Sequence, residues 1–134
     1  MLLTTWTSLP DQIPTHFGFD GAPDGWGSKS TLLFIPLITT VIFAALTLLS
    51  RFPHIYNYPW KLTGQNAGTQ YLYARTFLTA IKTEVIWLFG FVEYGIVQTA
   101  AGKSEGLGVS ILPIILLVFF GTVVFYFLKA WQAR

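Results

Sequence analysis

Cysteine is absent from the 134 residues, so the chain has no disulfide, no cysteine ligand for a metal and no thiol nucleophile. Charged residues are scarce too, at 10% of the chain, where a soluble domain carries roughly 25%. The net charge of +2 is too small to indicate a nucleic-acid-binding protein. Hydrophobic residues, by contrast, make up 53%, and the mean hydropathy is +0.57. These proportions indicate an integral membrane protein in contact with a lipid bilayer.

Three apolar segments predict an all-α membrane protein with three transmembrane helices. Residues 31–50 and 107–128 contain no charged side chain. Each is long enough to cross a hydrocarbon core of about 30 Å at a rise of about 1.5 Å per residue. The third predicted span covers residues 71–101, which include charged residues. The predicted organisation is a short Pro/Gly-rich extracytoplasmic cap at residues 1–30, followed by a transmembrane region at residues 31–134.

The cations predict how the chain is oriented in the membrane. One predicted side has only Lys29 and Lys103. The other side has Arg51, Lys61, Arg75, Lys129 and Arg134. By the positive-inside rule, the loop at residues 51–70 and the C-terminus lie in the cytoplasm, and the N-terminal cap lies outside.

The composition of the cap predicts turns and extended chain. Pro10 and Pro14 disfavour a helix and bias the residues before them toward extended conformations. Two Asp-Gly pairs predict tight turns. Ser28 or Ser30 is placed to cap the first long helix.

The same cap contains the first set of candidate binding residues. They are His16, Asp20, Asp24, Trp26 and Lys29. In one interpretation they form a pocket for a partner on the outer surface. In the other, His16 and Asp24 bond to the turn backbone and hold the cap on the membrane. The two acids do not fit the D-x-D-x-D-G calcium loop, so we predict no metal site.

The segment from Leu9 to Lys29 also resembles a known pattern. It reads LPDQIPTHF and then GAPDGWGSK, which resembles LP-x-x-IP-x-HF followed by G-x-PDGWGSK. That pattern marks the bacterial membrane domain of unknown function at the N-terminus of Sdp-type immunity proteins. The resemblance implies a multi-pass protein of the bacterial cytoplasmic (inner) membrane. Members of that family carry a further apolar helix before the motif, so we expect either a variant without that helix or a trimmed or mis-set start.

The middle predicted span contains the second set of candidates, Lys82, Glu84 and Glu93. At about 100° per residue, Lys82 and Glu93 share a stripe and Glu84 lies opposite. Lys82 and Glu84 are expected near the cytoplasmic interface, where Lys82 can snorkel. Glu93 is expected at the centre of the buried part, where an ionised acid costs roughly 2.5–3.5 kcal/mol. A protonated carboxyl, a proton or ion relay, and a contact with a partner chain are the alternatives.

The cytoplasmic loop is the third candidate region. Asn57, Pro59 and Trp60, followed by Arg75, resemble an N-x-P and N-x-x-x-Q-Y-x-x-x-R pattern of the same proteins. The pattern includes Gln70. Physically, an aromatic loop stiffened by proline is suited to lie among lipid headgroups or to offer a partner surface.

The sequence offers no support for an enzyme. It contains no G-x-S-x-G, H-E-x-x-H, P-loop or G-x-G-x-x-G motif. The two histidines, His16 and His54, are predicted on opposite sides of the bilayer. We therefore expect a protein without a catalytic site or cofactor.

Three functions stay open at this point. The first is a non-catalytic accessory subunit of a larger membrane protein complex. The second, implied by the resemblance, is an immunity or signalling protein against a membrane-active peptide. The third is a homo-oligomeric transport protein.

Overall fold

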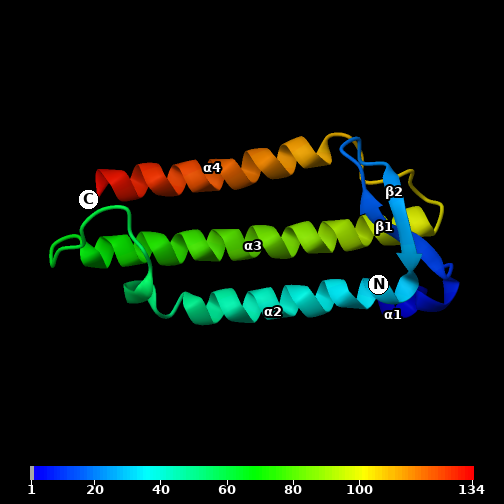
Figure 1. Ribbon diagram of the computed structural model, residues 1–134, viewed down its shortest axis with the longest axis horizontal. Coiled ribbons are helices and arrows are strands. Elements are labelled where there is room, and N and C mark those ends of the chain that lie inside the picture. The colour runs from blue at the N-terminus through cyan, green and yellow to red at the C-terminus, as the bar shows by residue number, and fades with distance from the viewer. Residues whose placement is uncertain (1) are drawn as a thin grey trace.

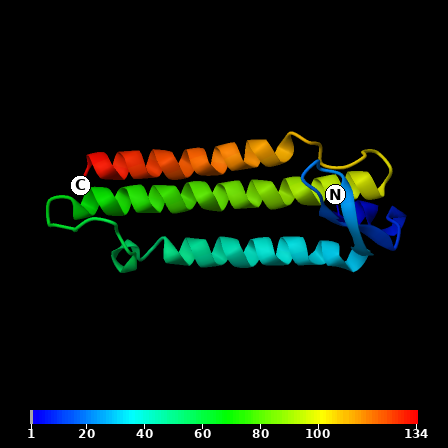
Figure 2. The same cartoon turned by 45° about the horizontal axis from the view of Figure 1, so that its top comes forward.

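The computed structural model describes residues 2–134. Its three long helices, α2 (Phe34–Leu49), α3 (Ala67–Ala100) and α4 (Ile111–Gln132), run side by side (Figure 1). In the turned view α3 still lies between the other two, so it packs against both neighbours (Figure 2). The shorter elements are α1 (Leu2–Thr5), the 3-10 turns η1 (Trp6–Ser8), η2 (Lys29–Leu33) and η3 (Pro53–Ile55), and the strands β1 (Gln12–Phe17) and β2 (Pro23–Ser28).

The cap is a β-hairpin, which corrects the all-α prediction in this region. Strands β1 and β2 pair antiparallel, with Gln12 opposite Ser28 and Phe17 opposite Pro23. The prolines exclude a helix here, and Gly21 adopts a positive φ of 77° in the turn that joins the strands. Ser28 caps the 3-10 turn η2 and not the long helix for which it was predicted: its hydroxyl accepts a hydrogen bond from the Ser30 N–H. The N-cap of α2 is Leu33, which makes no side-chain cap hydrogen bond.

The long helices differ in their bounds from the predicted spans 31–50, 71–101 and 107–128. Helix α2 begins later because residues 29–33 form the 3-10 turn η2. Helix α4 begins only at Ile111, since Gly102, Gly106 and Gly108 in the preceding loop all have positive φ. Helix α3 begins earlier, at Ala67.

Two helical segments in the described chain are long and apolar enough to cross a membrane. They are Lys29–Leu49, with a hydropathy of 2.6, and Ile111–Gln132, with a hydropathy of 2.7. Of the most apolar 18-residue stretch in each segment, 6% of the residues are buried within the protein in the first and 0% in the second. Long apolar helices with so few buried residues leave apolar surface uncovered, and lipid can cover it. The two helices therefore indicate a membrane protein.

A small core fixes the hairpin to the helices. Its buried residues are Leu9, Ile13, Leu32, Ile96 and Val97. They come from the segment before β1, from β1 itself, from the turn before α2 and from the last turns of α3. The hairpin is therefore packed against the ends of two helices.

The hairpin also contacts the loop between α3 and α4. The Leu107 N–H donates to the Gly21 carbonyl oxygen at 2.8 Å. The Leu107 side chain lies against Gly95 of α3 so closely that a Cβ at Gly95 would be 2.1 Å from Leu107 Cδ2. We call this end of the molecule, residues 2–33 with the loop at residues 101–110, the cap end.

Candidate functional sites

The hairpin turn brings together three of the five candidate residues of the cap. The His16 ring Nδ1 contacts the Asp24 Oδ1, and both side chains are exposed. Asp20 Oδ1 accepts a hydrogen bond from the Ala22 N–H at 3.0 Å, which closes the turn. These contacts hold the turn in shape, although His16 bonds to a side chain and not to the turn backbone. Among residues 2–134 no group of three His, Cys, Asp or Glu side chains is placed to hold a metal.

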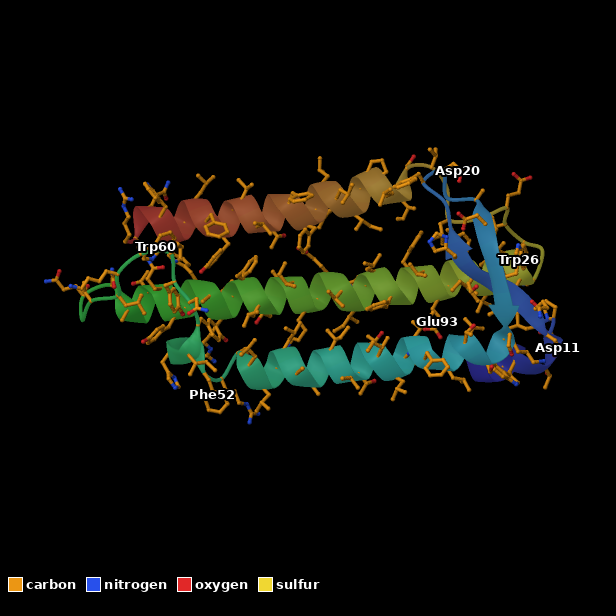
Figure 3. The ribbon with its side chains drawn as sticks, viewed as in Figure 1. Asp11, Asp20, Trp26, Phe52, Trp60 and Glu93 are labelled. Atoms are coloured by element: carbon orange, nitrogen blue, oxygen red, sulfur yellow. The ribbon has the colours of Figure 1, made fainter. Side chains whose placement is uncertain are left out.

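The other two cap candidates lie elsewhere on the hairpin. Lys29, at the open end, forms an ion pair with Asp11 at 3.0 Å, and its Nζ lies 5.8 Å from the centre of the Trp6 ring. Trp26 is 59% exposed, opposite Pro14 on the neighbouring strand. Figure 3 shows Asp11 and Asp20 at different ends of the hairpin. The five candidates therefore do not converge on one pocket.

Two charged residues of α3 bond to the neighbouring helices. Lys82 Nζ donates to Thr47 Oγ1 of α2 at 3.0 Å and lies 4.7 Å from the centre of the Phe43 ring. On the other side of α3, the Thr122 hydroxyl of α4 donates to Glu84 Oε1. These contacts tie the central helix to both neighbours with side-chain hydrogen bonds.

The contacts show where the two acids of α3 lie along the bundle. Thr122 lies at the middle of α4, so its partner Glu84 is level with the middle of the bundle. Val92 packs against the core beneath the hairpin, which places its neighbour Glu93 toward the cap end (Figure 3). Glu84 Oε2 and Glu93 Oε1 are both buried and lack a hydrogen-bond partner in the described part of the chain.

The outward face of α3 carries polar residues that neither neighbour covers. Thr76, Thr79 and Thr83 are exposed there, in line with Trp87, which is 75% exposed. A shallow groove along this face is lined by Arg75, the three threonines and Glu84, together with Leu72 and Ala80. The central helix thus presents hydroxyls and charge where α2 and α4 present apolar side chains.

The third candidate region folds against the helix ends opposite the cap. Asn57 and Pro59 line a cavity of about 220 Å³ between the loop and the helices. Trp60 packs edge-on against Trp131 of α4, with ring centres 6.3 Å apart (Figure 3). Arg75 is exposed on α3. The loop is therefore a packed structure attached to both α3 and α4.

Two tyrosines hold this loop through their hydroxyls. Tyr56 OH donates to the Leu49 carbonyl oxygen at 2.6 Å, and Tyr58 OH donates to the Pro53 carbonyl oxygen at 2.9 Å. Burial, followed by the neighbouring tyrosines, raises the pKa of Tyr58 to about 12. Tyr58 therefore keeps its proton, and remains a hydrogen-bond donor, throughout the physiological pH range.

Gln70 is a structural residue that did not figure among the candidates. Its side chain is 0% exposed, and its Nε2 donates to the carbonyl oxygens of Ala130 at 2.9 Å and Ala133 at 3.0 Å. It therefore caps the C-terminal end of α4 from α3. In the sequence, the one feature that pointed to Gln70 was its place in the Q-Y-x-x-x-R pattern. We call this end of the molecule, formed by the loop at residues 50–66, the first three turns of α3 and the last turn of α4, the basic end.

The fold and these contacts define a small helical protein with two helices apolar enough for a membrane. The family model described as "Domain of unknown function (DUF1648)" matches residues 1–40. The matched part contains the hairpin and the start of α2, including the segment from Leu9 to Lys29.

A relative adds a second similarity. An uncharacterized protein of Archaeoglobus fulgidus is 37% identical over 65 residues, which is 42% of this chain and 36% of the relative. The matched part thus spans about a third of that relative's length. No solved structure matches the chain.

Proposed function

We propose that this chain is an integral membrane protein whose three long helices all span the bilayer, and that it is a non-catalytic accessory subunit of a larger membrane protein complex. The observation that carries the proposal is the uncovered polar face of α3. That helix is the central one, yet only its two flanks are packed against helices of the same chain. We propose that a helix of a partner subunit packs against this exposed face.

The threonines make this face suitable for helix packing. The hydroxyls of Thr76, Thr79 and Thr83 donate to the carbonyl oxygens four residues earlier, at 2.9 Å in each case. Since their hydroxyls are already bonded, these residues present small surfaces at helical spacing. Small residues let a second helix approach closely within a membrane.

The charges favour a different chain over a second copy. Two copies packed through this face about an axis along the membrane normal would bring Arg75 against Arg75 and Glu84 near Glu84. Like charges at short range are unfavourable, most of all at membrane depth. A partner helix with a hydrogen-bond donor would instead complete Glu84, whose Oε2 lacks a partner in the described chain.

Crosslinking from the α3 face tests the subunit proposal. A photoreactive residue at Thr79 is expected to capture a single protein of different mass in native membranes. The matched control is Val41 of α2, which is 53% exposed and does not line the groove. If Thr79 captures only another copy of this chain, the homo-oligomeric alternative replaces the proposal. If it captures only what Val41 captures, this face has no partner.

Cysteine labelling tests the orientation that we propose, with the cap outside. The cysteine-free chain is a ready background, and Phe19 in the hairpin turn is 89% exposed. An impermeant thiol reagent added to intact cells is expected to label Phe19→Cys. Gly64→Cys in the loop is expected to react only after the membrane is opened. Labelling of position 64 in intact cells would show that the loop lies outside and that the proposed orientation is wrong.

A further inference from the structure

Charge is divided unequally between the two ends of the molecule. The cap end contains two cations, Lys29 and Lys103, together with four acids, Asp11, Asp20, Asp24 and Glu105. The basic end contains five cations, Arg51, Lys61, Arg75, Lys129 and Arg134, all exposed. The two remaining acids, Glu84 and Glu93, belong to the middle and the cap side of α3. No Asp or Glu lies at the basic end.

Within residues 2–134, the cations of the basic end have no acidic partner. The ion pairs of the described residues are His16 with Asp24 and Lys29 with Asp11, both in the cap. Arg75 also lines the groove of α3, which the proposed partner would cover, and the other four cations are available to anions from outside. The five cations come from three separate segments, so they do not converge on one pocket.

Aromatic residues accompany these cations. The Arg134 guanidinium carbon lies 3.5 Å from the centre of the Trp131 ring, and Trp131 packs against Trp60. A guanidinium that stacks on a ring keeps its N–H groups at its edges, where they can donate to phosphate oxygens. Tryptophan and tyrosine favour the headgroup level of a bilayer. In this protein Trp131 lies in the last turn of the apolar helix α4.

We propose that the basic end is a binding surface for the phosphate groups of anionic phospholipids. The inference rests on the part of the proposed function that places the helices in a bilayer, and it is independent of the partner subunit. A ring of cations and aromatic side chains around the ends of apolar helices matches the level at which a leaflet presents its headgroups. Each lysine or arginine near an anionic leaflet strengthens binding severalfold.

Lipid competition tests this surface directly. The purified full chain is placed in vesicles that contain brominated phosphatidylglycerol or brominated phosphatidylcholine, and quenching of tryptophan fluorescence gives the relative binding constants. We expect a clear preference for phosphatidylglycerol. The double variant Lys61→Gln/Arg134→Gln should lose roughly fivefold of that preference per cation removed. The charge-retaining variant Lys61→Arg/Arg134→Lys should keep most of it.

Two comparisons separate this surface from general electrostatic attraction. The control Lys29→Gln/Lys103→Gln removes the same charge from the cap end and should leave the preference unchanged. Inorganic phosphate at millimolar concentration should not compete, because no single pocket gathers the cations. Equal affinity for both lipids, equal loss in the cap-end control, or competition by free phosphate would each overturn the inference. None of these outcomes bears on crosslinking at Thr79, so the two proposals can fail separately.

Discussion

Replacing Gln70 with glutamate is expected to release the end of α4 from α3 and to lower the stability of the protein severely. The Gln70 amide donates to two carbonyl oxygens at the C-terminal end of α4 and is fully buried. A carboxylate in its place would face those two oxygens at the negative end of the helix dipole. An uncompensated buried charge costs about 3–5 kcal/mol. Thermal unfolding in detergent, followed by circular dichroism, measures the loss.

Two further variants show whether charge or missing hydrogen bonds cause this effect. Gln70→Leu removes the donors without adding charge and should cost about 1–3 kcal/mol, the penalty of buried acceptors without partners. Gln65→Glu introduces the same charge at an exposed position of the same end and should be nearly neutral. Acidification should restore Gln70→Glu in part, because a protonated carboxyl can donate one hydrogen bond. If Gln70→Glu unfolds at the same temperature as the unmodified protein, Gln70 does not hold the end of α4.

Gln70 also illustrates the limit of what the sequence predicts. The apolar helices α2 and α4 were predictable because uncharged runs of sufficient length are a local signal. The partner of Gln70 lies 60 residues away in the chain, at Ala130. That contact depends on how far α4 extends and how it is aligned along α3. Neither property has a local signature.

The depth of Glu84 and Glu93 shows the same limit. Helical periodicity correctly predicted that the two acids point in different directions from α3. Their depth, however, follows from which residues of α2 and α4 lie beside them. Pairing of Glu84 with Thr122, and packing of Val92 beneath the hairpin, set that alignment. The depths in the bilayer that were counted inward from a predicted span end stay predictions.

The hairpin was predictable in part. The prolines correctly predicted extended chain, and the first Asp-Gly pair, Asp20-Gly21, lies in the turn, because these signals act on φ within a few residues. The turn predicted at the second pair was wrong, since Asp24 and Gly25 lie within strand β2. Pairing of the two strands requires residues 12–17 and 23–28 to align across the turn. This register places Lys29 and His16 at different ends of the hairpin. The five cap candidates therefore do not line one pocket.

A second large effect is expected at Gly21, where the hairpin meets the loop before α4. Gly21 has a φ of 77°, and a Cβ added there would lie 2.5 Å from the Gly108 carbonyl oxygen. Gly21→Ala thus combines an unfavourable backbone conformation, about 1 kcal/mol, with overpacking against backbone, about 1–3 kcal/mol. The hairpin and the loop should separate, which would also remove the hydrogen bond from Leu107 to Gly21.

Gly102→Ala is the matched control for this variant, since Gly102 has a similar φ of 69° but open space around its missing side chain. It bears the conformational cost alone, so the difference between the two variants measures the contact between hairpin and loop. We expect Gly21→Ala to unfold at a clearly lower temperature than Gly102→Ala and to become sensitive to protease at residues 101–110. Equal unfolding temperatures would mean that the loop moves aside at no cost. In that case the hairpin would be fixed to the helices by its core with Ile96 and Val97 alone.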